Sequence, residues 1–280
     1  MMAAIGLGSA SNKLQRNCRT SPYLAYHEIT EAESEYLYGI SRRQFKEHLR
    51  CVQRLATVNR SGSNLLHITF DDGHVSQYDH AFSVLQELSM KATFFVTASW
   101  TGKRPGYMTW KQLAELARCG HEVQSHGWSH TLLTQCSAKE LQIELSRSRH
   151  ELEDQLGAKV KAISLPGGRW NTRVLEACRE SGYEQVFTSD PWMVPEDVKG
   201  LQIAGRWMVT HNMSAQRIDF LLKGKGVALY LLHARHFAKE TAKLMLGDGA
   251  YRSLWRMLAN KDKSLEDARI IPDPAKRPQA

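Results

Sequence analysis

Strand-like apolar runs alternate with helix-like segments through most of this 280-residue chain. The runs at 65–70 and 92–97 are short and rich in aromatic and β-branched residues, as strands are. Between such runs, apolar side chains recur every three or four positions, which is typical of helices packed on a sheet. Strands that alternate with helices predict a parallel sheet with crossover connections, most readily a barrel. Further strands are predicted at 121–125, 160–165, 185–189 and 200–207.

Several of the predicted helices have recognisable ends. Ser137 and Glu140 have the spacing of a capping box, in which each side chain satisfies a backbone amide of the other residue. Thr109 caps another helix, which stops near Gly120. Further helices are predicted from Ser41, over 79–90, towards Gly157 and over 172–180.

Two adjacent carboxylates stand just past one predicted strand. Residues 69–73 read Thr-Phe-Asp-Asp-Gly, so Asp71 and Asp72 follow the run that ends at Phe70. Past a later strand, His126 and His130 lie four positions apart. Two imidazoles and one carboxylate make the three-ligand set of a catalytic zinc site, and cobalt or nickel accept the same donors. The other carboxylate is then available to take a proton from water.

Each motif alone has a simpler interpretation. Asp-Asp-Gly is a common turn sequence, and two histidines four apart are often surface residues. The helical zinc-protease signature is excluded, because it needs glutamate directly after its first histidine, where this chain has Gly127. The joint placement of both motifs at strand ends, with Gly73 and Gly127 allowing a tight backbone, favours a metal site.

The segment from about 64 to 192 resembles the NodB-homology polysaccharide deacetylases, carbohydrate esterase family four. Their first motif, Thr-Phe-Asp-Asp-Gly, is complete at 69–73. Their second, His-Ser/Thr-x-x-His, stands at 126–130 with glycine in place of Ser/Thr. The resemblance implies an α/β fold, an irregular and incomplete (β/α) barrel.

The same resemblance implies roles for the residues of these two motifs. Asp71 would be the general base, and Asp72, His126 and His130 would bind one divalent metal. The implied reaction is hydrolysis of an acetamide on an amino sugar.

The later motifs of the family are less complete. The third usually has an arginine two residues before its proline, but Ser164 stands two residues before Pro166. With Pro166, we take Gly167 and Arg169 as candidate substrate-binding residues. Trp192, a loose counterpart of the tryptophan in the fourth motif, is another candidate, and a core or rim tryptophan is an equal alternative.

Two histidines are candidates for the general acid. Leu231-Leu232-His233 matches the fifth motif, Leu-x-His, but it lies in a run of helix formers, where a histidine need not face the metal. His27 ends a strand-like run after Tyr26, and many similar deacetylases begin with a Tyr-His segment near the active site. A strand-end histidine without chemistry is an equally good interpretation of His27.

The two ends of the chain differ from its middle. Residues 1–20 are small, polar and irregular and predict a loose tail, whereas 21–212 hold the predicted barrel. Residues 213–280 predict a basic helical extension packed on the barrel. From Leu221 onwards the sequence has twelve Lys/Arg and six Asp/Glu. A basic helix with Trp and Leu on its apolar face can also lie on an anionic membrane. Nucleic-acid binding is not expected, since no recognised motif accompanies the charge.

Localisation follows from what the sequence lacks. Five cysteines, an odd number without paired spacing, predict no disulfide framework. Residues 1–10 have no charged leader before an apolar stretch, and no apolar run approaches the length of a membrane span. We therefore expect a cytoplasmic protein, with peripheral contact at the inner face of the membrane as the alternative.

These observations together predict a metal-dependent hydrolase. Its substrate would be an N-acetylated amino sugar in a polysaccharide or in a lipid-linked precursor. Two alternatives stay open: a deformylase or esterase acting on another acylated sugar, and a glycan-binding protein that kept the metal site without catalysis.

Overall fold

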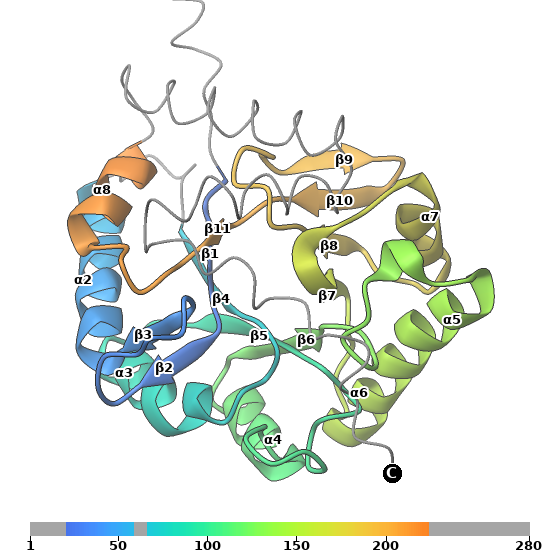
Figure 1. Ribbon diagram of the computed structural model, residues 1–280, viewed down its shortest axis with the longest axis horizontal. Helices are drawn as coiled ribbons and strands as arrows, with labels where there is room; N and C mark the ends of the chain where they lie inside the picture. Colours follow the sequence, from blue (N-terminus) through green and yellow to red (C-terminus); the bar gives the residue numbers. More distant parts are fainter. Residues whose placement is uncertain (1–20, 59–65, 224–280) are drawn as a thin grey trace, which may run out of the picture. The chain divides into compact units, whose positions relative to one another are not determined.

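The computed structural model describes residues 21–58 and 66–223, which belong to a unit that ends at Gly224 (Figure 1). Within these ranges a nine-stranded sheet has the order β11-β1-β4-β5-β6-β7-β8-β10-β9. Neighbouring strands are parallel, except that β9 runs antiparallel to β10. The sheet curls but keeps two edge strands, β11 and β9, so the irregular, incomplete (β/α) barrel is confirmed.

The strands are short, with two to five residues each. Their bounds are β1 Tyr23–Tyr26, β2 Glu28–Thr30, β3 Gly39–Ser41, β4 His67–Phe70, β5 Ala92–Val96, β6 Glu122–Ser125, β7 Ala162–Ser164, β8 Gln185–Phe187, β9 Glu196–Val198, β10 Leu201–Ala204 and β11 Trp207–Met208. Strands β2 and β3 form a separate parallel pair.

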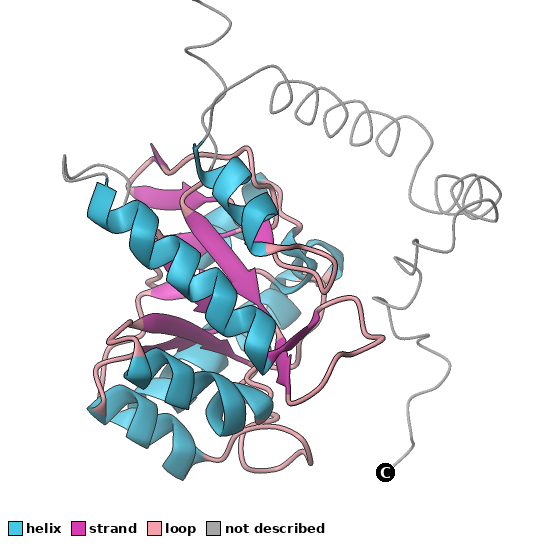
Figure 2. Ribbon diagram, turned by 90° about the vertical axis from the view of Figure 1, so that its left-hand side faces the viewer, coloured by secondary structure: helices cyan, strands magenta, loops and turns pink. Residues whose placement is uncertain are grey.

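Helices surround the strands, and Figure 2 shows them as an outer layer seen from the side. Their bounds are α2 Arg42–Val58, α3 Phe82–Glu87, α4 Trp110–Arg118, α5 Ala138–Gln142, α6 Ser148–Leu156, α7 Thr172–Glu180 and α8 Ala215–Lys223. Two π-helical turns, η1 Gln77–Ala81 and η3 Ile143–Arg147, and two 3₁₀ turns, η2 Leu133–Gln135 and η4 Pro166–Gly168, lie between them.

The predicted helix ends are confirmed. Thr109 and Gln112 form a reciprocal capping box at the start of α4, and Ser137 and Glu140 form another at the start of α5. The second helix continues through η3 and α6 and ends at Gly157, whose φ of 64° is the left-handed conformation that favours glycine.

One strand prediction was wrong in a way that matters for function. The run over 200–207 is not one strand, because Gly205 and Arg206 lie between β10 and β11. The short strand predicted from Tyr23 is confirmed as β1, which ends just before His27. Periodicity alone cannot detect one or two residues that leave a ladder. His27 and Arg206 are therefore at strand ends, where side chains can enter a site.

Alternation along the strands divides the core into two layers. Phe94 of β5 stacks on Phe70 of β4 with ring centres 4.8 Å apart, and both are fully buried. The next residue, Phe95, instead joins Phe187 in a separate buried cluster. Burial of each such side chain stabilises the fold by roughly 1.5–3 kcal/mol, so these layers hold the strand ends in register.

The last described helix, α8, packs against α2. His48 Nε2 lies 2.7 Å from the carbonyl oxygen of Met213, and Cys51 Sγ donates to the carbonyl oxygen of Ala215 at 3.6 Å. The tail at 1–20 and most of the predicted extension, including His233, lie outside the described residues. Among the helices of the described ranges, none is both long and apolar enough to cross a membrane.

Candidate active site

The predicted site residues follow strands β1, β4, β6 and β7, which end at one edge of the sheet. Strands β1, β4, β5, β6 and β7 are consecutive neighbours, all parallel, so their carboxyl ends share an edge (Figure 1). Asp71 follows β4 and His126 follows β6, while His27 and Leu165 follow β1 and β7.

The three predicted metal ligands lie together at this edge. Nε2 of His126 is 3.2 Å from Oδ1 of Asp72, and Nε2 of His130 is 3.1 Å from the same oxygen. One donor atom from each of the three residues lies within 4.8 Å of the others. Asp72 and His130 have positive φ values, 71° and 63°, which non-glycine residues adopt at a cost of order 1–3 kcal/mol. The backbone is thus held in an unfavourable conformation that aims these side chains at one point.

The donor chemistry of this cluster fits a divalent cation. Oδ1 of Asp72 is buried and accepts no hydrogen bond from the described residues, although two imidazole nitrogens lie within 3.2 Å. Nδ1 of His126 lies 2.7 Å from the carbonyl oxygen of Ser164, which can only accept, so this nitrogen carries the proton of a neutral ring. Its Nε2 lone pair then points at the cluster. Two imidazoles and one carboxylate suit zinc, cobalt or nickel.

Charge in the cluster shifts the pKa values of Asp72 and His126 in opposite directions. Burial alone would raise the pKa of Asp72, but the imidazoles of His126 and His130 lower the pKa of this carboxyl well below its ordinary value. Burial would lower the pKa of His126, but the carboxylates of Asp71 and Asp72 outweigh it and raise that pKa. In the absence of a cation, the carboxylates therefore attract a proton to the site that a metal would displace.

Asp71 is not part of the cluster but of a buried ion pair. Nη1 and Nη2 of Arg206 donate to Oδ1 and Oδ2 of Asp71, each at 2.7 Å. Oγ of Ser164 donates to Oδ2 of Asp71 at 3.1 Å and accepts from Nη2 of Arg206 at 2.7 Å. Arg206 is fully buried and also donates to Oγ1 of Thr69 and the carbonyl oxygen of Thr188.

This pair keeps Asp71 ionised. Burial would raise the pKa of the carboxyl, but the guanidinium of Arg206 more than offsets it and lowers the pKa of Asp71 to about 2. A two-point contact with a planar guanidinium also fixes the plane of the carboxylate.

Arg206 is the functional residue that sequence reasoning missed. The family resemblance places an arginine where Ser164 stands, and Arg169 was the nearest arginine to it. In the structure the guanidinium that holds Asp71 comes from the β10–β11 connection instead, and Ser164 contacts both partners. The sequence offered one signal, a lone arginine after glycine within a strand-like run, which by itself is not specific.

His27 lies beside Asp71. The register Tyr26↔Phe70 places the two residues that follow these strands next to each other, and the amide of Asp71 donates to the carbonyl oxygen of Tyr26 at 2.9 Å. Nε2 of Gln77 donates to the carbonyl oxygens of both His27 and Asp71, at 2.7 and 2.5 Å.

The His27 side chain is half-buried, and its Nδ1 atom is buried. It stacks on Tyr38 with centres 4.7 Å apart, and its Nδ1 has no hydrogen-bond partner among the described residues. Burial lowers the pKa of His27, an effect that the carboxylates of Asp72 and Asp71 oppose. A neutral imidazole with an unpaired nitrogen is therefore part of this site.

The candidate substrate-binding residues lie on two nearby connections. Pro166 and Gly167 lie in the turn η4, which Leu165 separates from β7, and Arg169 follows the turn. Gly167 has a φ of 66°, and a Cβ there would lie 2.7 Å from Cδ2 of Leu132, so a larger residue would be strained at this position. Trp192 packs edge-on against Trp207, with ring centres 5.3 Å apart.

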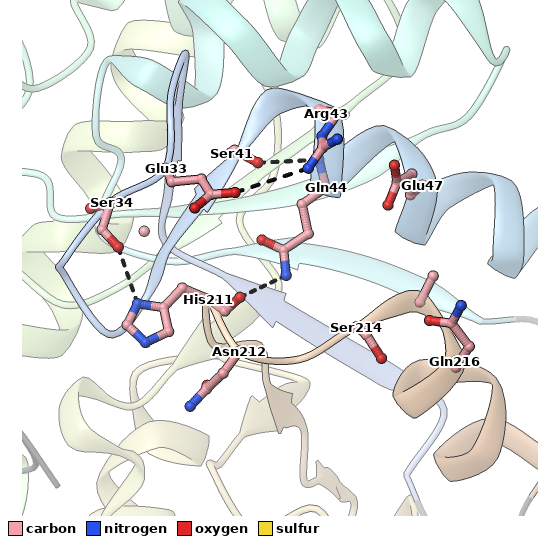
Figure 3. A pocket seen from close by; sticks show the side chains of 12 residues that line it. Glu33, Ser34, Ser41, Arg43, Gln44, Glu47, His211, Asn212, Ser214 and Gln216 are labelled. Carbon is pink, nitrogen blue, oxygen red and sulfur yellow. Dashed lines mark hydrogen bonds and ion pairs between the residues drawn. The ribbon is translucent and has the colours of Figure 1, made fainter. Parts of the chain in front are cut away.

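A polar cavity of about 420 Å³ lies elsewhere, between the β2–β3 connection, the start of α2 and the segment before α8 (Figure 3). Nε2 of Gln44 donates there to the carbonyl oxygen of His211 at 2.7 Å, and His211 Nδ1 lies 3.1 Å from the carbonyl oxygen of Ser34. Its lining includes neither Asp71 nor a member of the metal cluster.

Similarity to known proteins agrees with the geometry. Residues 59–186 match the family described as polysaccharide deacetylase. Putative polysaccharide deacetylase YxkH of Bacillus subtilis is 27% identical over 207 residues, which cover 69% of this chain and 72% of that protein. Peptidoglycan-N-acetylglucosamine deacetylase PgdA of Listeria monocytogenes is 34% identical over 110 residues, but these cover 39% of this chain and only 22% of that protein.

Among solved structures, Streptococcus pyogenes deacetylase PplD in complex with acetate has the same fold. Its TM-score is 0.64 at 24% sequence identity, with 74% of this chain and 99% of that chain covered.

Proposed function

We propose, because residues 59–186 match the polysaccharide deacetylase family, that this protein is a metal-dependent hydrolase that removes acetyl groups from amino sugars of a glycan. One observation carries the proposal. A cluster of Asp72, His126 and His130 with the donor chemistry of a divalent-cation site lies beside a carboxylate, Asp71, that is held ionised by Arg206.

Asp72, His126 and His130 would hold the cation, for which zinc is our first choice. A bound ion would lower the pKa of a coordinated water and polarise the acetamide carbonyl. The unpaired oxygen of Asp72 and the two imidazole nitrogens that face it support this assignment.

Asp71 would accept a proton from the attacking water. Arg206 orients the carboxylate and keeps it ionised at neutral pH. Because the pKa of Asp71 is about 2, it is a weak base and would hold this proton only briefly. The proton must then pass to a group of higher pKa.

His27 would be the group that delivers a proton to the leaving nitrogen as the carbon–nitrogen bond breaks. It lies beside Asp71, and its buried Nδ1 is without a hydrogen-bond partner among the described residues. Without this proton the amine would have to leave as an anion, which is a poor leaving group. His233 is the alternative donor, and it lies outside the described residues.

The substrate we propose is an N-acetylhexosamine in a polysaccharide or in its lipid-linked precursor. PgdA is named for N-acetylglucosamine of peptidoglycan, and YxkH for a polysaccharide in general. Pro166, Gly167, Arg169 and Trp192 would border the sugar. Contact of the basic residues after Leu221 with an anionic membrane, and a cytoplasmic location, stay predictions from the sequence.

The test uses the full chain and acetylated glucosamine oligosaccharides. Acetate and free amine should appear in equal amounts, stop after chelation and return when zinc, cobalt or nickel is restored. Formylated and O-acetylated analogues measure the two alternative activities. Acetate release that is unaffected by chelation would contradict the proposal, and hydrolysis of formamide or ester alone would replace it.

A further inference from the structure

A second group of side chains lies next to the metal cluster. The ring of Trp100, in the β5–α4 connection, is 5.2 Å from the ring of His130. Cζ of Arg104 lies 4.4 Å from the centre of Trp100 and 5.1 Å from that of Tyr107. The guanidinium of Arg104 thus stacks on two aromatic rings, and one of them, Trp100, lies next to the predicted metal ligand His130.

A neighbouring ring repeats this arrangement. Trp128 lies between the two ligand histidines in the sequence, and Cζ of Arg147 is 3.8 Å from the centre of its ring. Nζ of Lys103 is 5.9 Å from the same ring. The amide of Ser99 donates to the carbonyl oxygen of Trp128 at 3.0 Å, so the two connections that carry these rings are joined. We call the whole group the basic aromatic surface: Trp100, Lys103, Arg104, Tyr107, Trp128 and Arg147.

Hydrogen bonds fix the backbone of this surface. The amide of Gly102 donates to the carbonyl oxygen of Met108, whose own amide donates to the carbonyl oxygen of Gly73, each at 3.0 Å. The buried carboxylate of Glu144 accepts from the amides of Trp128 and Ser129, both at 2.9 Å. The backbone that carries these rings is therefore held by hydrogen bonds within the described chain.

The positive charge of this surface is not neutralised within the described residues. Lys103, Arg104 and Arg147 are exposed, and within those ranges no carboxylate forms an ion pair with them. Stacking holds a guanidinium by its flat face and leaves the N–H groups at its rim directed outwards. Such groups bind carboxylate and phosphate oxygens in pairs.

We propose that the basic aromatic surface binds a negatively charged group, a carboxylate or a phosphate, on the part of the glycan next to the acetamide under hydrolysis. The preferred substrate is then an anionic glycan rather than a neutral one. This inference rests on the proposed function, because it names the substrate class of that site. Its reason is geometric: the surface starts at His130 and presents three cations whose charges the described chain leaves available.

The test compares three tetrasaccharides of N-acetylated sugars with the metal-loaded full chain. One is neutral chitotetraose, one alternates N-acetylglucosamine with N-acetylmuramic acid and so carries carboxylates, and one is chitotetraose phosphorylated at its reducing end. Initial rates give kcat/KM, and calorimetry gives binding. At low salt an anionic tetrasaccharide should be preferred, and the preference should shrink as salt is added. The two anionic arms tell whether carboxylate or phosphate is the better ligand.

Charge-removing variants locate the effect. Each exposed charge should contribute about two- to fivefold, so Arg104→Gln with Arg147→Gln should lower affinity for the anionic tetrasaccharide roughly tenfold. Binding of neutral chitotetraose should change less than twofold. The pair Arg104→Lys with Arg147→Lys keeps the charge but lacks the paired N–H groups, so its affinity for the anionic tetrasaccharide should fall between those of the parent and the glutamine pair. Lys159→Gln removes an exposed charge just before β7, at the opposite strand end, and is the matched control.

The outcomes separate this inference from the proposed function. If no tetrasaccharide is hydrolysed, the proposed function fails, while a calorimetric preference that depends on Arg104 and Arg147 still supports the surface. Equal binding of neutral and anionic tetrasaccharides by the parent would overturn the inference. So would a loss in the glutamine pair that is as large for the neutral tetrasaccharide as for the anionic ones.

Discussion

Arg206 holds Asp71 through two hydrogen bonds of 2.7 Å, although 135 positions separate these residues in the sequence. The guanidinium comes from between β10 and β11, and Ser164, the last residue of β7, contacts both partners. The small side chain of Ser164 leaves room for a guanidinium that arrives from elsewhere. An orienting contact to the carboxylate is thus present even though the local sequence motif that would supply it is incomplete.

Removal of Arg206 should destabilise the fold and not only the activity. In Arg206→Gln the carboxylate of Asp71 stays buried without its cation, and breaking such a pair costs about 3–5 kcal/mol. Urea unfolding measures this loss. The double variant Arg206→Gln with Asp71→Asn should recover part of it, because no unpaired charge remains. A single variant as stable as the parent would show that the pair is not needed for folding.

If His126 and His130 bind the metal, removal of either imidazole should lower the metal content. A catalytic site with three protein ligands binds weakly once one is removed, so His126→Ala and His130→Ala should each lose most of about one ion per chain. Metal analysis of purified protein measures the content. His150→Ala, an exposed histidine on α6, is the control and should keep the ion. Unchanged content in both ligand variants would mean that metal binds elsewhere.

Substitutions of the two adjacent carboxylates, Asp71 and Asp72, should have different effects on turnover and on metal content. Asp71→Asn should lower the rate of deacetylation by ~10²–10⁴, the usual effect of losing a general base, with metal content nearly intact. Asp72→Asn should instead weaken metal binding, because it removes the negative charge of the carboxylate whose Oδ1 faces both imidazoles. Metal content and turnover measured on the same preparations decide, and the reverse pattern would exchange the two assignments.

Features that depend on residues close together in the sequence were predicted, whereas contacts between distant parts of the chain were missed. Asp72, His126 and His130 were predicted because each motif is local and the parallel order of strands brings both to one edge. The caps at Thr109 and Ser137 were predicted for the same reason. Arg206 was missed because its partner lies in another part of the chain, so no spacing records the contact. The basic aromatic surface was missed likewise, since its rings come from two separate connections.

Acid should destabilise the fold through two buried histidines. Burial lowers the pKa of His48 and of His121 to about 4, from an ordinary value of 6.5. Both rings are neutral in the folded chain and take up a proton more readily when unfolded. Their contribution is therefore complete above pH 6.5 and is lost as the pH falls towards 4, by about 3 kcal/mol for each ring.

Urea unfolding between pH 7 and pH 4 measures that slope. His48→Gln and His121→Gln should each be less stable than the parent at pH 7 or similar to it, but should lose less stability on acidification. A slope that is the same in both variants and the parent would assign the acid sensitivity to other groups.

His27 and His233 are alternative proton donors, and substitution of each distinguishes between them. His27 follows β1 beside Asp71 and has a buried Nδ1 without a hydrogen-bond partner in the described ranges, so it is placed to deliver a proton to the leaving nitrogen. We expect His27→Gln to lower kcat by ~10²-fold or more, with metal content and folding intact, and His233→Ala to stay within roughly tenfold of the parent. A substrate with a better leaving group distinguishes a proton donor from a structural role, because it needs less help: it should restore His27→Gln far more than Asp71→Asn. If the kcat of His233→Ala collapses and that of His27→Gln does not, then Leu231-Leu232-His233 supplies the general acid and His27 is a packing residue.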